Sequence, residues 1–155
     1  MRVIFVCYAN LCRSPMAEAV FRRLVVEAGL AGAVSMDSCG TSALRAGEMP
    51  APATMKVLAD NGIRDYVHVS RPITPRDLAE ADYLVAMDEQ VAADIRAVGE
   101  PRGAVVRLLD FAPQIATRDV PDPYYDLTGH AYKTVYKLVD LGCRGLLEHI
   151  AKALA

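Results

Sequence analysis

The sequence predicts an α/β protein: a single three-layer domain in which a four-stranded parallel sheet carries helices on both faces. Predicted strands and helices alternate along the chain, which is the pattern of a parallel sheet. The strands are nearly continuous apolar runs, as expected where helices cover both faces. The 155 residues are 53% hydrophobic and 23% charged, so one domain over residues 1–155 can bury a sizeable core.

The first two elements are predicted by residue type and by capping signals. Residues 3–6, Val-Ile-Phe-Val, are β-branched or aromatic and favour a buried strand. Residues 15–29 show apolar residues at helical spacing. Ser14 is the expected N-cap of this helix and Pro15 its first helical residue. A loop therefore joins the first strand to the first helix.

The remaining elements continue the alternation. We predict strands at residues 34–39, 83–87 and 105–109, and helices at 54–61, 89–98 and 128–153, with a short helix capped by Thr74 and Pro75. A long segment without predicted secondary structure covers residues 110–127. Its length indicates a functional role, because unstructured loops of this size are uncommon in compact domains.

Charge and hydropathy narrow the range of partners. The net charge is −2 and no block of like charge occurs, so neither nucleic acid nor an anionic membrane is an expected partner. No apolar run approaches the roughly 20 residues that cross a bilayer, and no leader pattern is present. We expect a cytoplasmic protein, monomeric with at most weak self-association.

The four cysteines are expected to be reduced thiols rather than a disulfide scaffold. A zinc site is the alternative, because Cys7 and Cys12 have C-x4-C spacing and Cys143 and His149 lie near the other end. The second pair lies on a predicted helix at six-residue spacing, which places its side chains on different faces. We therefore expect no metal and no cofactor.

The loop after the first strand combines a thiol with an anion site. Cys7 ends the strand, and Arg13 follows after five residues at the start of the helix. A cysteine near a helix N-terminus and an arginine ionises more readily than a free thiol. The guanidinium and the loop N–H groups suit a tetrahedral oxyanion. The pattern predicts a phosphate-binding loop that transfers a phosphoryl group to sulfur.

Such a reaction needs an acid to protonate the leaving oxygen. The long segment offers four candidates, Asp110, Asp119, Asp122 and Asp126, and the residue pattern alone does not choose among them. The carboxyl ends of the predicted strands carry Cys7, Cys39 and Asp88, which a parallel sheet should bring to one edge.

Residues 7–18, Cys-Tyr-Ala-Asn-Leu-Cys-Arg-Ser-Pro-Met-Ala-Glu, resemble the signature of the low-molecular-weight protein tyrosine phosphatases. Residues 122–125, Asp-Pro-Tyr-Tyr, resemble the second signature of that family. Between them Asp37-Ser38, Gly40-Thr41, His68, Arg71 and Ala86-Met87-Asp88 fall in family order. The resemblance covers the whole chain.

The resemblance implies a role for each matching residue. Cys7 would be the nucleophile, Arg13 would bind phosphate, and Asp122 would act first as general acid and then as base. The rest of the phosphate-binding loop would be Tyr8, Ala9, Asn10, Leu11, Cys12 and Ser14. The implied substrates are phosphotyrosine proteins and aryl phosphate monoesters, with no cofactor and no metal.

Further residues are implied to support this centre. Ser14 would stabilise the thiolate, and Ser38 and His68 would join Asn10 in a network that holds the loop in shape. Two tyrosines, Tyr124 and Tyr125, would flank the substrate's entry. Cys12 would be a redox partner that traps Cys7 as a reversible disulfide.

The sequence departs from the family pattern at three places that we expect around the substrate rim. Leu44 stands where the family often has Trp, residues 51–53 (Ala-Pro-Ala) stand where it often has Asp-Pro-Arg, and Ala9 stands where Gly is common. Ala9 suggests an altered loop path, because Ala resists positive φ. We hypothesise that Tyr8 supplies the aromatic wall that Leu44 does not.

Three other functions are open at this point. A thioredoxin-coupled arsenate reductase uses a similar loop, but needs further resolving cysteines, and none lies between Cys39 and Cys143. Protein arginine phosphatases of the same fold resemble this loop but carry Thr where Leu11 stands. A non-catalytic phosphate-binding module would not need a nucleophile, an arginine and an acid together.

Overall fold

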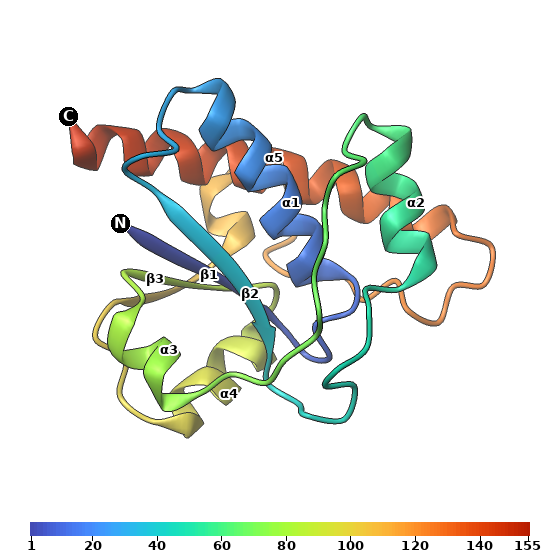
Figure 1. Cartoon of the computed structure of the whole chain (residues 1–155), viewed down its shortest axis with the longest axis horizontal. Coiled ribbons are helices and arrows are strands. Elements are labelled where there is room, and N and C mark those ends of the chain that lie inside the picture. The colour runs from blue at the N-terminus through green and yellow to red at the C-terminus, as the bar shows by residue number, and fades with distance from the viewer.

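The computed structural model describes residues 1–155 and contains one sheet of four parallel strands (Figure 1). Its strands are β1 (Arg2–Cys7), β2 (Ser35–Gly40), β3 (Tyr83–Ala86) and β4 (Ala104–Arg107). They lie in the order β2-β1-β3-β4, with every neighbouring pair parallel. The predicted four-stranded parallel sheet is confirmed.

Helices cover both faces of this sheet (Figure 1). The helices α1 (Arg13–Glu27), α2 (Pro52–Asp60) and α5 (His130–Leu154) lie on one side, and α3 (Pro75–Glu80) and α4 (Glu89–Val98) on the other. The predicted three-layer arrangement is therefore confirmed. None of the helices combines the length and apolar character needed to cross a membrane.

The alternation of side chains along β1 divides the core into two parts. Val3 and Phe5 belong to the cluster that includes α1 and α5, and Phe5 meets Phe21 of α1 edge to face with ring centroids 5.3 Å apart. Ile4 and Val6 belong to the cluster that includes α3 and α4. All four β1 side chains are fully buried, as expected for the central region of a covered sheet.

Most predicted elements agree with the structure to within a residue or two, but the start of α1 differs in a way that matters. The helix begins at Arg13 with Cys12 as N-cap residue, so the prediction of Ser14 as the N-cap is wrong. The backbone continues the helix further back, where Met16 N–H donates to Cys12 O (3.1 Å). The hydroxyl of Ser14 is thereby left free to contact Cys7.

The end of the fourth strand also differs from the prediction. β4 ends at Arg107, and residues 108–109 belong to a 3-10 turn, Leu108–Phe111, instead of the strand. The Asp110 carboxylate accepts from Arg107 N–H (3.3 Å) and caps this turn. Helix α5 packs closely there: a Cβ on Gly145 would lie 1.8 Å from Phe111 O, so only glycine fits.

The topology places a crevice at the carboxyl ends of β1 and β3. The chain leaves β1 toward β2 on one side and later returns to β3 on the other, which is the usual position of a ligand site in a doubly wound sheet. The segment after the 3-10 turn crosses this edge, where Val120 N–H donates to Met87 O (2.8 Å). Residues far apart in the sequence therefore meet at this crevice.

Candidate active site

A cavity of about 260 Å³ lies beside the loop that joins β1 to α1. Pockets for drug-sized ligands enclose roughly 300–1,000 Å³, so this one is sized for a single side-chain group. It is lined by Cys7, Tyr8, Ala9, Leu11, Cys12, Arg13, Leu44, Arg45, Asp122, Tyr124 and Tyr125. Asn10 and Ser14 do not line the cavity and are fully buried.

The sulfur of Cys7 meets two hydrogen-bonding groups of its own loop. Asn10 N–H donates to Cys7 Sγ (3.3 Å), and Ser14 Oγ lies 3.0 Å from the same sulfur. Ser14 Oγ accepts from Asn10 Nδ2 (2.8 Å), so its own proton is directed either to Cys39 O (3.3 Å) or to the Cys7 sulfur, which a thiolate would favour. Only 3% of Cys7 is exposed, so its negative charge would depend on these donors rather than on water.

Asn10 holds the loop through both ends of its side-chain amide. Its Oδ1 accepts from Arg71 N–H (3.1 Å) and contacts His68 Nε2 (2.7 Å). Its Nδ2 donates to Ser14 Oγ (2.8 Å) and to Ser38 Oγ (3.1 Å). Because the Arg71 N–H is a fixed donor, the orientation of the amide is determined, and Asn10 connects two distant segments, β2 and residues 68–71, to Cys7.

Asn10 is also the one non-glycine residue with positive φ, at 58°. Asparagine tolerates this left-handed conformation better than most residues. Ala9 does not have positive φ, so the left-handed position of this loop is Asn10, and the altered loop path expected from Ala9 stays a prediction.

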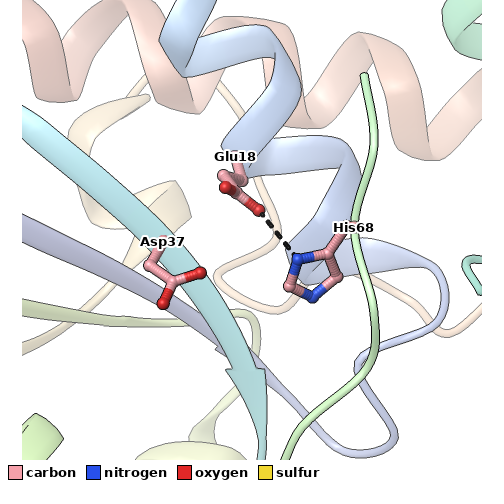
Figure 2. Close-up of side chains that lie close together, drawn as sticks. All are labelled: Glu18, Asp37 and His68. Carbon is pink, nitrogen blue, oxygen red and sulfur yellow. Dashed lines mark ion pairs between the residues drawn. The ribbon is translucent and has the colours of Figure 1, made fainter. Parts of the chain in front are cut away.

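The helix α1 that follows this loop carries a buried carboxylate, Glu18 (Figure 2). Its Oε2 accepts from Tyr66 OH (2.5 Å) and Ser38 OH (2.9 Å), and Arg22 donates to its Oε1 (2.7 Å). His68 Nδ1 is 3.6 Å from Oε2. Burial lowers the pKa of His68, while the charge of Glu18 acts in the opposite direction.

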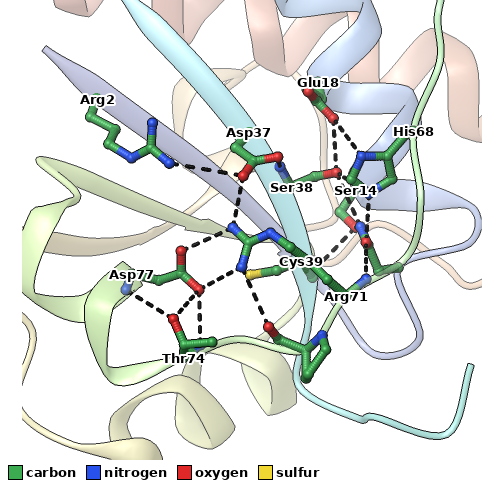
Figure 3. A network of polar contacts seen from close by, with 12 residues as sticks. Arg2, Ser14, Glu18, Asp37, Ser38, Cys39, His68, Arg71, Thr74 and Asp77 are labelled. Atoms are coloured by element: carbon green, nitrogen blue, oxygen red, sulfur yellow. Dashed lines mark hydrogen bonds and ion pairs between the residues drawn. The ribbon is translucent and has the colours of Figure 1, made fainter. Parts of the chain in front are cut away.

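Glu18, Asp37 and His68 have ligand atoms within 4.8 Å of one another, which raises the question of a metal. Both Glu18 oxygens are already bound by donors, and His68 Nε2 is engaged by Asn10. Asp37 accepts from Arg71 Nη2 at 2.8 Å (Figure 3). A cation would have to displace these bonds, so the cluster suits a polar network better than a metal centre.

Arg71 extends the network to the helix α3 (Figure 3). Its guanidinium binds both oxygens of Asp77, at 2.8 and 2.9 Å. Asp77 also forms a capping box with Thr74. Burial opposes ionisation of Asp77, but the bonds from Arg71 and Thr74 outweigh it and hold the pKa of Asp77 below its usual value.

Gly40, the last residue of β2, packs directly against the loop that joins β1 to α1. A Cβ at this position would lie 2.6 Å from Tyr8 O and 3.1 Å from Asn10 N. Gly40 N–H also donates to Arg71 O (2.9 Å). The loop can approach β2 this closely only because residue 40 has no side chain.

Arg13 is held in place by groups from two other segments. Its Nη1 donates to Asp88 Oδ2 (2.7 Å) and to Val120 O (3.0 Å), and its Nη2 lies 3.7 Å from Asp122 Oδ2. Burial opposes its charge, but Cys7 and the two carboxylates outweigh this effect and raise the pKa of Arg13. The side chain, 4% exposed, is thus oriented beside the cavity.

Asp88, expected at the edge of the sheet and in family order, also binds Arg13, a contact that the sequence did not predict. Its second oxygen accepts from Val91 N–H (2.8 Å) and caps α4. Asp88 directly follows a predicted strand, as Cys7 does, and the carboxyl ends of parallel strands meet at one edge of the sheet. This position was the sequence signal that could have pointed to a contact with the loop of Cys7. The expected meeting of Cys7, Cys39 and Asp88 at one edge is consistent with the strand register.

Asp122 is the one member of the four candidate acids that lines the cavity. It accepts from Tyr124 N–H (3.1 Å), and its side chain is 44% exposed. The other three are engaged elsewhere: Asp110 at the 3-10 turn, Asp119 with Glu89 N–H (3.0 Å), and Asp126 with Thr128 and Ala131. The geometry therefore distinguishes acids that the residue pattern left equivalent.

The sequence profile of the family described as "Low molecular weight phosphotyrosine protein phosphatase" matches residues 2–155. This chain belongs to that phosphatase family. The "Low molecular weight protein-tyrosine-phosphatase YfkJ" of Bacillus subtilis is 38% identical over 97% of this chain and 96% of its own. The "Low molecular weight phosphotyrosine protein phosphatase" of Schizosaccharomyces pombe is 41% identical over 97% of each chain.

Solved structures of the phosphatase family confirm the predicted fold. The crystal structure of YfkJ matches with a TM-score of 0.91, covering 99% of this chain and 96% of that one. The structure of "DARP, drosophila arginine phosphatase" matches with a TM-score of 0.90 at 27% identity, covering 97% and 98%. The resemblance indicated by residues 7–18 and 122–125 is thus confirmed at the level of family and fold.

Several residues that were expected at the substrate rim line the cavity. Tyr8, Leu44, Tyr124 and Tyr125 line it, and Leu44 is 77% exposed. Residues 51–53 do not line it, so their assignment to the rim is wrong. They form the start of α2, where Ala51 N–H donates to Leu11 O (3.0 Å) and tethers the loop from outside the cavity.

Cys12 lines the same cavity as Cys7 and makes an unpredicted contact. Its sulfur lies 3.3 Å from the hydroxyl of Tyr132, a residue of α5. Burial raises the pKa of the Cys12 thiol to about 11, although hydrogen bonds from Tyr132 and Thr54 act in the other direction. Cys39 and Cys143 are fully buried, and all four cysteines are free thiols.

Proposed function

We propose that this phosphatase hydrolyses phosphotyrosine in proteins, and aryl phosphate monoesters, through a phosphoryl-cysteine intermediate on Cys7. The observation that carries the proposal is that Cys7, Arg13 and Asp122 line one small cavity. A thiol nucleophile, an oxyanion-binding guanidinium and an acid are the three groups that this reaction needs.

In the first step the Cys7 thiolate attacks phosphorus. The sulfur–phosphorus bond forms while the bond from phosphorus to the tyrosine oxygen breaks. Arg13 and the loop N–H groups bind the phosphoryl oxygens, and protonated Asp122 gives its proton to the departing phenolate. Asp88 and Val120 O act indirectly, because they hold the guanidinium in place before substrate arrives.

In the second step the Asp122 carboxylate accepts a proton from water, whose oxygen attacks phosphorus. The sulfur–phosphorus bond breaks, and inorganic phosphate and the Cys7 thiolate are released. Ser14 O–H and Asn10 N–H stabilise the sulfur as it regains its negative charge. These donors serve the same sulfur when it attacks and when it leaves.

The walls of the cavity support an aryl substrate. Leu11, Tyr8 and Tyr124 offer apolar surface to an aromatic ring. Only 3% of Cys7 is exposed, so the phosphate must reach the sulfur on an extended side chain. Tyr8, which is 53% exposed, supports the hypothesis that it serves as the aromatic wall in place of Leu44.

Phosphoarginine is the second candidate substrate, because the fold closely matches that of an arginine phosphatase. Leu11 lines the cavity where the resemblance implies Thr in arginine phosphatases. An apolar side chain cannot hydrogen-bond a guanidinium, and this favours phosphotyrosine.

We further propose that the protein works in the cytoplasm, as a monomer and without a cofactor. A thiolate nucleophile requires a compartment that keeps thiols reduced. The nucleophile, the guanidinium and the acid that the reaction needs are all supplied by this chain, which supports a monomeric enzyme.

The test compares wild type, Cys7→Ser and Asp122→Asn on phosphotyrosine, phosphoserine and phosphoarginine peptides, with a metal chelator present. We expect phosphotyrosine to be hydrolysed fastest, Cys7→Ser to be inactive, and Asp122→Asn to lose about 10²–10⁴-fold in kcat. Asp119→Asn is the control, because Asp119 lies in the same segment but does not line the cavity.

A phosphate adduct on wild-type Cys7, trapped by rapid acid quench and located by mass spectrometry, would support the intermediate directly. Turnover by Cys7→Ser, or activity that requires an added metal, would overturn the mechanism. Preference for the phosphoarginine peptide would replace the proposed substrate. Arsenate reduction with thioredoxin, assayed in parallel, would identify the reductase.

A further inference from the structure

The cavity has two cationic residues, and the phosphate mechanism uses only one of them. Arg13 is 4% exposed and is paired with Asp88, and the proposed mechanism assigns it to the phosphoryl oxygens. Arg45 lies at the rim with 42% of its side chain exposed. It makes no contact with the catalytic groups, so its charge has no role in the two steps above.

The backbone beneath Arg45 is well anchored. The segment begins where Thr41 N–H donates to Cys7 O (3.0 Å) and Ser42 N–H donates to Tyr8 O (2.9 Å). It ends where Gly47 N–H donates to Ser70 O (2.8 Å). Arg45 is therefore presented from a turn that is tied at one end to the phosphate-binding loop.

The guanidinium of Arg45 is also oriented by the opposite side of the rim. Its Nη2 donates to Tyr124 OH (2.8 Å), and its Cζ lies 5.6 Å from the centre of the Tyr124 ring. The same Tyr124 donates its backbone N–H to Asp122. Stacking on an aromatic ring fixes the plane of a guanidinium and leaves other N–H groups free to bind.

Only one carboxylate neutralises Arg45, and it does so weakly. Glu48 Oε1 lies 3.5 Å from Nη1, and its side chain is 49% exposed. Exposed pairs of this kind contribute little and exchange readily with solvent or ligand. An anionic group on a bound substrate could take the place of Glu48 without leaving a buried charge behind.

We infer that Arg45 is a specificity residue that selects phosphotyrosine sites flanked by an anionic group, either an acidic side chain or a second phosphorylated residue. This inference rests on the proposed function, because it concerns which phosphopeptides enter the same cavity. The flanking anion binds the free N–H groups of Arg45 while the phosphotyrosine occupies the cavity. Substrates with basic flanks are disfavoured by repulsion from the same guanidinium.

The test measures kcat/KM on phosphotyrosine peptides that differ only in the flanking residues: Glu, phosphoserine, Gln or Lys, placed on either side. Wild type should prefer the Glu peptide over the Lys peptide by about two- to fivefold at low salt. The preference should shrink in about 1 M salt, where screening acts over roughly 3 Å. The ratio between peptides is used because it cancels any general effect of a substitution on the Asp122 loop.

Three variants and one control separate charge recognition from simple bracing of Tyr124. Arg45→Gln should abolish the Glu-over-Lys preference, Arg45→Glu should reverse it, and Glu48→Gln should increase it. Arg144→Gln on α5 removes the same charge from an exposed residue outside the cavity, and should keep the wild-type ratio.

The outcomes distinguish the inference from the proposed function. If phosphotyrosine peptides are hydrolysed but the flank has no effect, or if Arg45→Gln slows all of them equally, Arg45 only braces Tyr124 and the inference is overturned. If no phosphotyrosine peptide is hydrolysed, the proposed function fails and the inference with it. A gain with both Glu and phosphoserine supports general anion recognition, and a gain with phosphoserine alone assigns Arg45 to a second phosphate.

Discussion

The hydroxyl of Tyr132 on α5 lies 3.3 Å from the sulfur of Cys12, in the wall of the cavity that contains Cys7. This contact joins the last helix of the chain to the first loop. The hydrogen bond from Tyr132 acts against burial, which otherwise keeps Cys12 protonated with a raised pKa. Tyr132 is thus placed to influence how readily Cys12 reacts.

We predict that Tyr132→Phe weakens protection of the enzyme against peroxide. Hydrogen peroxide would convert the Cys7 thiolate to a sulfenic acid, and Cys12 would then attack that sulfur, forming a disulfide and releasing water. Loss of one hydrogen bond, about 1 kcal/mol, should slow this closure by about fivefold. More Cys7 would then be overoxidised, and dithiothreitol would restore less activity than in wild type.

Tyr136 lies one turn further along α5, and its hydroxyl accepts from Arg23 instead of contacting Cys12. Tyr136→Phe is therefore the matched control. Cys12→Ser sets the lower limit of recovery. Equal recovery in Tyr132→Phe and wild type, with a Cys7–Cys12 disulfide found in both, would show that the contact has no redox role.

We predict that Asp88→Asn weakens phosphate binding without unfolding the protein. Asparagine keeps the N-cap of α4, because it can accept from Val91 N–H as aspartate does. It loses the charge-assisted bond to Arg13, a kind of bond that contributes about 1.5–3 kcal/mol. We therefore expect kcat/KM for an aryl phosphate to fall by about 10- to 100-fold.

Inhibition by inorganic phosphate provides the second measurement for Asp88→Asn. Its inhibition constant should rise together with the loss of kcat/KM, since both depend on the orientation of Arg13. An unchanged inhibition constant would mean that Val120 O alone is sufficient to hold the guanidinium.

The contrast between Arg13 and Asp88 illustrates what could be predicted from the sequence. Cys7, Arg13 and Ser14 lie within eight consecutive positions, so their meeting follows from one strand, one loop and one helix. The sheet could be predicted from the sequence in the same way, because the residue patterns of strands and helices are local. The boundaries at Ser14 and at residues 108–109 were wrong because tertiary contacts with Cys7 and α5 override local capping and strand preferences.

The partners that come from distant segments could not be derived in the same way. Asp122 was one of four equivalent acids until the crossing of Val120 over Met87 placed it at the cavity. Tyr132 and Arg45 depend on how α5 and the turn after β2 pack, which residue spacing does not encode. The resemblance to the family supplied Asp122, but it did not indicate the contact of Cys12 with Tyr132 or that of Arg45 with Tyr124.

We predict that Gly40→Ala impairs both stability and catalysis. The new Cβ would lie 2.6 Å from Tyr8 O, and backbone atoms cannot move aside as side chains can. Overpacking of this kind costs about 1–3 kcal/mol in the free energy of unfolding. Because the clash is with the loop that carries Cys7 and Arg13, kcat should fall as well, and the melting temperature and kcat should be measured together.

Gly32→Ala is the control for this glycine, since a Cβ there has no atom within 4 Å and the backbone is not left-handed. It should change the free energy of unfolding by no more than about 0.5 kcal/mol. If Gly40→Ala proved as harmless as Gly32→Ala, the loop would be more adaptable than its close approach to β2 indicates.

We predict that the ion pair between Asp77 and Arg71 makes stability depend on pH in the acid range. The pKa of Asp77 is lower in the folded protein than the ordinary value of about 3.9, so folding favours its ionised form. This stabilisation is present above about pH 4 and is lost as the pH falls through the folded-state pKa. Asp77→Asn should therefore be less stable than wild type by about 2 kcal/mol near neutral pH, from the loss of bonds to a charged group.

Urea denaturation at about pH 7 and about pH 3 should show this difference narrowing as acid neutralises the wild-type carboxylate. A difference of the same size at both pH values would mean that Asp77 acts through packing and capping of α3 rather than through its charge.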